Sequence, residues 1–177
     1  MKKILLAAAV LTLGSSAASA GVLASCAATG CQSNINVTVT IVTQCATIQA
    51  NDIDFGTRFA TNATYDQAAN IDVVCNTGVP YNVELDKGIN PTGSTNQRRV
   101  ADGNSGEFMD YTIYQPSDAS GTTGATTTKW GSLADGQEFH STGTNAVQHL
   151  VATGRLTVLS TTKPGTYTDL VVAQLNF

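Results

Sequence analysis

The residues of this sequence that could perform acid–base or nucleophilic chemistry are few and lie apart. His140 and His149 are the two histidines, and no clustered cysteine or carboxylate accompanies either one, so surface or loop roles are favoured over catalysis. Ser105 lies in Asp-Gly-Asn-Ser-Gly, which is not the Gly-x-Ser-x-Gly of a nucleophile elbow, and no helical pattern follows it. The run Asp102 to Glu107 loosely resembles a calcium loop without the ligand spacing of one, and turn chemistry explains it better. We therefore expect no enzyme active site, no cofactor and no metal.

The cysteines are the other chemically reactive residues, and all four fall in the first half of the chain: Cys26, Cys31, Cys45 and Cys75. An even number of cysteines in an exported chain indicates two disulfides. A metal site is the alternative, but the sequence contains no Cys-x-x-Cys pair and both histidines are far away along the chain. A small loop closed by Cys26 and Cys31 would fix an otherwise irregular N-terminal extension.

The first twenty residues have the form of a secretory signal peptide. Lys2 and Lys3 precede an apolar run at 4–13, and Ala18-Ser19-Ala20 is a small-x-small cleavage site. A membrane-spanning helix is the weaker alternative, because the apolar run is about half the ~20 residues that such a helix needs. We expect residues 1–20 to be removed on export, with no membrane insertion.

The overall charge is acidic and the composition favours strands. The chain has 13 acidic and 9 basic residues with no Lys/Arg cluster, so it lacks the electrostatic footprint of a protein that binds nucleic acid. Charged residues make up only 12%, whereas small polar and β-branched residues are abundant, and such residues favour strands and turns over helices.

Short strand patterns separated by turn residues run along the whole chain. The clearest has Ile35, Val37, Val39 and Ile41 in strict alternation with polar residues, which is the period of a strand with one apolar face. The further candidates are Ile53–Phe55, Ala69–Cys75, Tyr81–Asp86, Asp110–Gln115, Val147–Leu159 and Tyr167–Phe177. Strands at this spacing indicate a single all-β domain, either a sandwich or a barrel.

The first and last strand patterns leave open which strands they pair with. Val171, Ala173, Leu175 and Phe177 alternate to the last printed residue, so the final strand must be covered by something. Periodicity alone favours pairing of Ile35–Ile41 inside its own sheet. The alternative is that this segment adds a strand to the open edge of another chain.

The aromatic residues also allow two interpretations. Trp130 and the tyrosines could form a glycan-binding surface, but core packing is the more common role of such side chains. The tyrosines are Tyr65, Tyr81, Tyr111, Tyr114 and Tyr167.

Three sequence patterns resemble a known family. They are NINVTVTIVTQC at 34–45 with IDFGT at 53–57, IDVVCNTGVPYNVELDKG at 71–88, and the ending GTYTDLVVAQLNF at 165–177, in which Gly-x-Tyr-x-Asp leads into a terminal apolar strand. Together they resemble the spore coat protein U family, which includes subunits of archaic, Csu-type chaperone–usher pili.

The resemblance implies an incomplete immunoglobulin-like sandwich at 42–177 that is completed by donor-strand exchange, after an extension at 21–41 that carries the donor strand. It implies a Cys45–Cys75 disulfide. It also implies that Ile35, Val37, Val39 and Ile41 fill the groove of the next subunit, and that Val171, Ala173, Leu175 and Phe177 form the edge of that groove.

The implied function is that of a structural pilus subunit that supports surface attachment and biofilm formation. Its partners would be identical or related pilin subunits, a periplasmic chaperone and an outer-membrane usher, with export through the periplasm to the cell surface. The alternatives are a non-polymerising secreted coat protein and a glycan-binding β-sandwich module.

Overall fold

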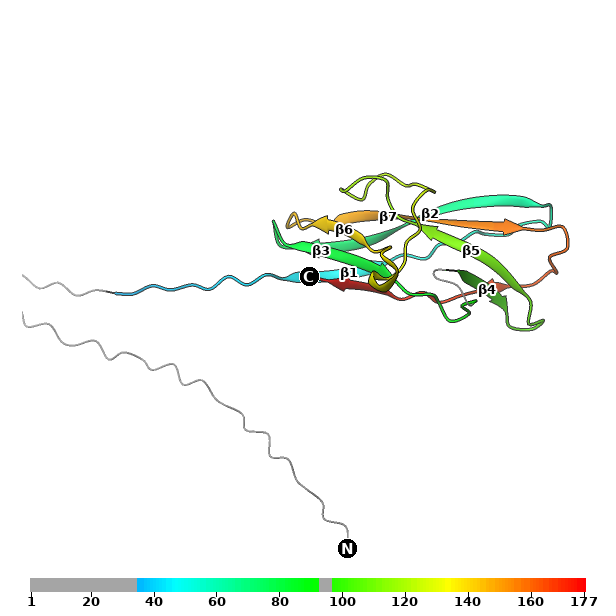
Figure 1. Cartoon of the computed structure of the whole chain (residues 1–177), viewed down its shortest axis with the longest axis horizontal. Coiled ribbons are helices and arrows are strands. Elements are labelled where there is room, and N and C mark those ends of the chain that lie inside the picture. Colours follow the sequence, from blue (N-terminus) through cyan, green and yellow to red (C-terminus); the bar gives the residue numbers. More distant parts are fainter. Residues whose placement is uncertain (1–34, 93–96) are drawn as a thin grey trace, which may run out of the picture. The chain divides into compact units, whose positions relative to one another are not determined.

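Antiparallel strands account for nearly all regular structure in the computed structural model, which describes residues 35–92 and 97–177 (Figure 1). The strands are β1 (Cys45–Ala50), β2 (Ala63–Cys75), β3 (Pro80–Leu85), β4 (Arg98–Asp102), β5 (Phe108–Tyr114), β6 (Phe139–Thr142), β7 (Gln148–Val158), β8 (Tyr167–Thr168) and β9 (Ala173–Asn176). A short 3-10 helix, η1, spans Leu133–Asp135.

The strands form two sheets. The larger has six strands in the order β1-β2-β7-β5-β4-β8, and the smaller has three in the order β6-β3-β9. The two longest strands, β2 and β7, pair antiparallel from Ala63 opposite Val158 to Val73 opposite Gln148. Apolar residues alternate with more exposed ones in β3 and β5, as expected of strands with one buried face. The all-β, immunoglobulin-like sandwich expected from the sequence is confirmed.

The core lies between the two sheets. Val73 and Leu150 from the larger sheet and Val83 from the smaller are completely buried, as is Trp130. The Trp130 indole N–H donates to the backbone carbonyl of Val83 at 2.8 Å, and its ring lies 5.7 Å from that of Phe139. Trp130, Tyr81 and Tyr111 are therefore core residues, as predicted, whereas Tyr65, Tyr114 and Tyr167 are only half-buried.

A disulfide joins the first residue of β1, Cys45, to the last residue of β2, Cys75, directly opposite it in the sheet. This confirms the pairing that the family resemblance implied. Cys26 and Cys31 lie outside the described residues.

Loss of this disulfide should weaken the domain substantially. The bond closes a sequence separation of 30 residues, and a loop of that size contributes about 3–4 kcal/mol through restriction of the unfolded chain. We expect the double variant Cys45→Ser, Cys75→Ser to lose about that much free energy of unfolding in urea titration. A midpoint equal to that of the parent would show that the bond adds nothing to the domain.

Three predicted strands differ from the structure. The alternating segment Ile35–Ile41 forms no strand, because a strand needs a hydrogen-bonded neighbour and this segment has none among the described residues. The segment Ile53–Phe55 also forms no strand, although both of its apolar side chains pack on the core. The predicted single strand Tyr167–Phe177 is two strands in different sheets, since β8 pairs with β4 and β9 pairs with β3.

A candidate strand-accepting groove

A groove of about 930 Å³ exposes part of the core between the two sheets. Its lining is apolar where it meets the strands: Ile71, Leu85, Val100, Met109, Tyr111, Ile113, Ala152, Leu156, Val158 and Ala173. Residues 50–60 and 162–171, which are irregular apart from Ala50 at the end of β1 and the short strand β8, complete the lining. Seven of these ten side chains are buried, whereas Val100, Met109 and Ala173 are half-buried, and apolar area of such half-buried residues is what another chain could cover.

Residues 51–60 follow β1 and pack against Gly154 of β7. A Cβ atom on Gly154 would lie 2.8 Å from Ile53 and 3.0 Å from Phe55, so the missing side chain is what lets Ile53 and Phe55 approach the sheet. The backbone of Asn51 still donates to the carbonyl of Asn70 at 2.9 Å. Beyond that residue, the described structure assigns no strand until β2.

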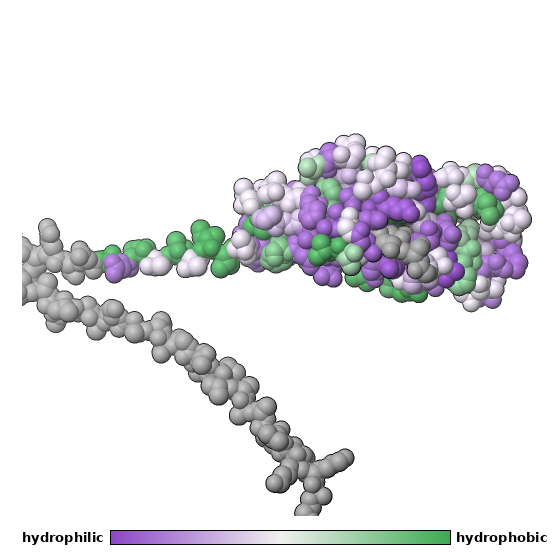
Figure 2. Space-filling view, viewed as in Figure 1, coloured by the Kyte–Doolittle hydropathy of each residue, from purple (hydrophilic) through white to green (hydrophobic). Residues whose placement is uncertain are grey.

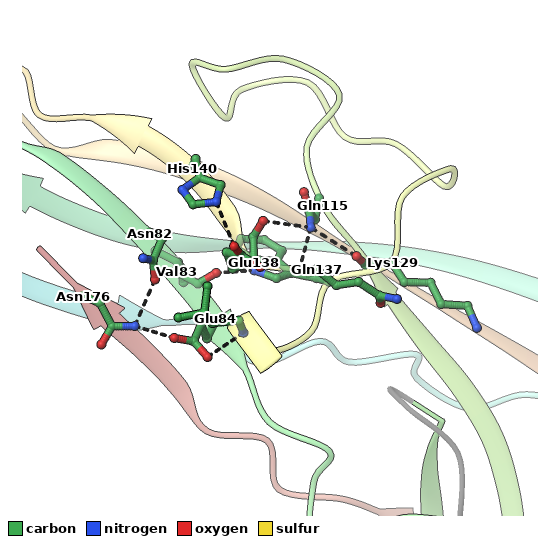
Figure 3. A network of polar contacts seen from close by, with 11 residues as sticks. Asn82, Val83, Glu84, Gln115, Lys129, Gln137, Glu138, His140 and Asn176 are labelled. Carbon is green, nitrogen blue, oxygen red and sulfur yellow. Dashed lines mark hydrogen bonds and ion pairs between the residues drawn. The ribbon is translucent and has the colours of Figure 1, made fainter. Parts of the chain in front are cut away.

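The last strand, β9, provides an edge on the other side. Among the described residues it pairs on one side only, with β3. Its outer face is fastened to β3 by Asn176, whose amide nitrogen donates to Asn82 at 2.9 Å and to Glu84 at 2.5 Å (Figure 3). The other oxygen of Glu84 accepts from the backbone of Leu133 at 2.8 Å. β1 comes close to β9 without pairing with it, so β9 keeps a backbone edge to which a further strand could pair.

The residues predicted to form this edge take two kinds of position. Val171, Ala173 and Leu175 are half-buried and pack against the core. Phe177 has the same parity but lies beyond β9 and is 65% exposed. Val171 and Ala173 line the groove.

The residues predicted to form the donor strand are solvent-exposed in the single chain. Ile35, Val37, Val39 and Ile41 are 81–90% exposed, and hydrophobic and polar residues alternate along this segment (Figure 2). The face of the domain that Figure 2 presents is largely hydrophilic by contrast. A row of exposed Ile and Val side chains is unusual for a soluble chain and indicates a surface that another molecule covers.

Sequence reasoning assigned no role to Asp169 and the polar groups that contact it. Asp169 lines the groove and accepts a hydrogen bond from the Tyr111 hydroxyl at 2.7 Å. Burial, together with this carboxylate, raises the pKa of Tyr111 above its ordinary value. Asp169 is the last residue of the Gly-x-Tyr-x-Asp pattern noted in the sequence. Its contacts come from residues 58 and more positions away along the chain, which no local pattern reveals.

The residues first considered for chemistry occupy separate surface positions. The His149 ring, on β7 of the larger sheet, contacts Asp72 at 2.7 Å. The His140 ring, on β6 of the smaller sheet, contacts Glu138 at 2.9 Å. In the described part of the chain, no three His, Cys, Asp or Glu side chains are grouped as metal ligands would be. Nor does any helix described there have the length and apolar character to cross a membrane.

The turn between β4 and β5 uses its polar residues internally. The Asp102 carboxylate accepts from the backbone of Asn104 at 3.4 Å and from that of Ser105 at 3.0 Å. It also accepts from the Ser105 hydroxyl, and this bond lowers the pKa of Asp102. The turn interpretation of Asp102–Glu107 agrees with these contacts.

A family model and a solved structure match this chain. The model of the Spore Coat Protein U domain matches residues 31–174. Among solved structures, the chain is similar to a chain of the chaperone–tip adhesion subunit pre-assembly complex CsuC–CsuE, from the archaic chaperone–usher Csu pili of Acinetobacter baumannii. The two are 26% identical with a TM-score of 0.52, and the match covers 78% of this chain and 40% of that one. Comparison with curated sequences found no match.

Proposed function

Because the chain belongs to the Spore Coat Protein U domain family, we propose that it is a structural pilus subunit that polymerises by donor-strand complementation. The observation that carries this proposal is the coexistence of an open apolar groove and a row of four exposed Ile and Val side chains in one chain. Insertion of the row into the groove of a second copy would bury both apolar surfaces at once.

The polymer would be open-ended. Each chain has one donor segment, Ile35–Ile41, and one accepting edge, β9, so each copy engages two neighbours through different surfaces. Such heterologous contacts generate filaments when the rotation between copies does not close a ring. The solved structure to which the chain is similar belongs to pili assembled by the chaperone–usher route, which supports a filament of this type.

The same comparison supports the partners we propose. A periplasmic chaperone would cover the groove before assembly, and an outer-membrane usher would export the growing filament to the cell surface. Surface attachment and biofilm growth would be the function of the filament. The net charge of −4 and the lack of a Lys/Arg cluster do not favour a nucleic acid as partner.

Hydrogen exchange can test the donor assignment directly. In a monomer, the amides of residues 35–42 should exchange at nearly unprotected rates, because this segment is exposed and forms no strand. In filaments, we expect the same amides to exchange at least roughly a hundredfold more slowly than in the monomer, as in a buried strand. The amides of β2 serve as the internal control and should be protected in both states.

Two outcomes would contradict the proposal. Fast exchange of residues 35–42 in assembled material would show that this segment is not the donor. A chain that stays monomeric with its chaperone and usher present, and that binds glycans, would instead support the sugar-binding alternative.

A further inference from the structure

The segment between β8 and β9, called the crossing below, passes from the larger sheet to the smaller one. The Asp169 carboxylate anchors it by hydrogen bonds. Asp169 accepts from the backbone of Ile89 at 3.0 Å and from the Asn90 side chain at 3.3 Å with one oxygen. Its other oxygen accepts from the Tyr111 hydroxyl at 2.7 Å. One side chain therefore ties the crossing to the β3–β4 connection and to β5.

A glycine makes room for this carboxylate. Gly88 has a φ of +71°, and a Cβ atom there would lie 2.1 Å from an Asp169 oxygen. Any other residue at position 88 would therefore displace Asp169, besides being strained in the left-handed region.

A second carboxylate holds the next residues of the crossing. Asp86 accepts from the backbone of Val172 at 2.9 Å with its side chain, and its own backbone donates to the Val172 carbonyl at 3.1 Å. The backbone of Asp86 is held in turn by Arg98, a completely buried residue whose guanidinium donates to the carbonyls of Asp86 and Leu85 at 2.8 and 3.1 Å. The crossing is thus fixed at Asp169 and again at Val172.

These contacts hold the crossing to its own domain. Val171 and Ala173, which follow Asp169 in the chain, line the groove as Asp169 does, and β9 has no partner strand among the described residues beyond β3. We infer that Asp169 is a positioning residue for donor capture: it holds the accepting edge in the extended conformation that an incoming strand requires. This inference rests on the proposed function.

Pre-organisation of this kind acts mainly on the rate of association. An edge that is already extended loses little conformational freedom when a strand adds to it, whereas an edge that must first be ordered binds more slowly. Loss of an ordinary interface contact changes chiefly the rate of dissociation. The two roles can therefore be separated by kinetics.

The experiment measures uptake of a fluorescent peptide of residues 35–42 by the full exported chain carrying Val39→Asp, which keeps the chain from donating its own strand. We expect Asp169→Ala to slow peptide association about tenfold or more, with dissociation changed less than about threefold. Asp169→Asn keeps an acceptor oxygen of the same geometry and should restore association to within about threefold of the parent. Gly88→Ala should reproduce the Asp169→Ala effect, because it displaces the same carboxylate.

The matched control is Asp118→Ala. Asp118 is not among the residues that line the groove, and it accepts from the backbones of Thr122 and Thr123 within its own loop at 3.2 and 2.7 Å, so its removal should leave both rates unchanged. Association of the Asp169→Ala chain at the parental rate would overturn the inference. So would a slowing matched by faster dissociation, which indicates a general structural role. If the parent itself takes up no peptide, the proposed function fails and this inference fails with it.

Discussion

Replacement of Val39 by aspartate is expected to abolish filaments while leaving a folded and exported chain. In the single chain the Val39 side chain is 81% exposed, so the substitution should not disturb the domain. In a filament the same side chain would enter the apolar groove of a neighbour. Even a neutral polar group buried there without a hydrogen-bond partner costs roughly 2–7 kcal/mol, and an unpaired carboxylate costs more. A junction between subunits would not survive a loss of that size, and electron microscopy should show no filaments.

The adjacent residue supplies the control. Thr38 alternates with Val37 and Val39, so in a strand its side chain faces away from the groove. Thr38→Asp adds the same charge one position away and should still give filaments. Filaments of normal number and length from the Val39→Asp chain would remove the basis for calling Ile35–Ile41 a donor strand.

A copy of residues 35–42 attached after Phe177 through a short flexible linker should convert the chain into a stable monomer. The copy lies next to the accepting edge β9, so it can fill the groove of its own domain. Full burial of one Val or Ile contributes about 1.5–3 kcal/mol by transfer from water, and the copy carries four such residues facing one way. Even after the cost of ordering the segment, we expect the melting temperature to rise by about 10 °C or more.

The control for this experiment carries Val39→Asp within the added copy only. It has the same length and linker and should melt close to the parent chain. A parental melting temperature for the unmodified graft, or continued polymerisation through its own N-terminal segment, would show that the groove does not accept this strand.

The strands that sequence patterns predicted well are those with one fully buried face. In β3 and β7, alternating apolar residues and flanking turn residues were sufficient to predict the strands to within a few positions. The strands that were missed carry weaker patterns. β1 has one large apolar residue, Ile48, in a six-residue edge strand, and β6 is only four residues long.

β4 was missed for a different reason. It begins with two arginines, a composition typical of an exposed loop. Arg98 is nevertheless completely buried, because its guanidinium donates to the carbonyls of Leu85, Asp86 and Trp130. Those acceptors come from distant parts of the chain, and no local pattern indicates that they converge.

The same distinction applies to the candidate site. The alternation of seven residues, Ile35–Ile41, indicates one apolar face, but periodicity alone favours pairing inside its own sheet. The donor role of this segment and the residues of the accepting edge came from the family resemblance, and both stay predictions. The hydrogen bonds of Asp169 and the packing of Phe55 against Gly154 could not be predicted, since each depends on how the sheets bring separate segments together.

The position of the disulfide has a mechanical consequence. Tension applied to residues 35–44 enters the domain at Cys45, the first residue of an edge strand. Without a covalent bond, the backbone hydrogen bonds between β1 and β2 would carry this tension. The bond to Cys75 transfers the force directly to the end of β2, whose pairing with β7 extends over eleven residue pairs. Those hydrogen bonds run perpendicular to the strands, so tension that passes along β2 is shared among many of them.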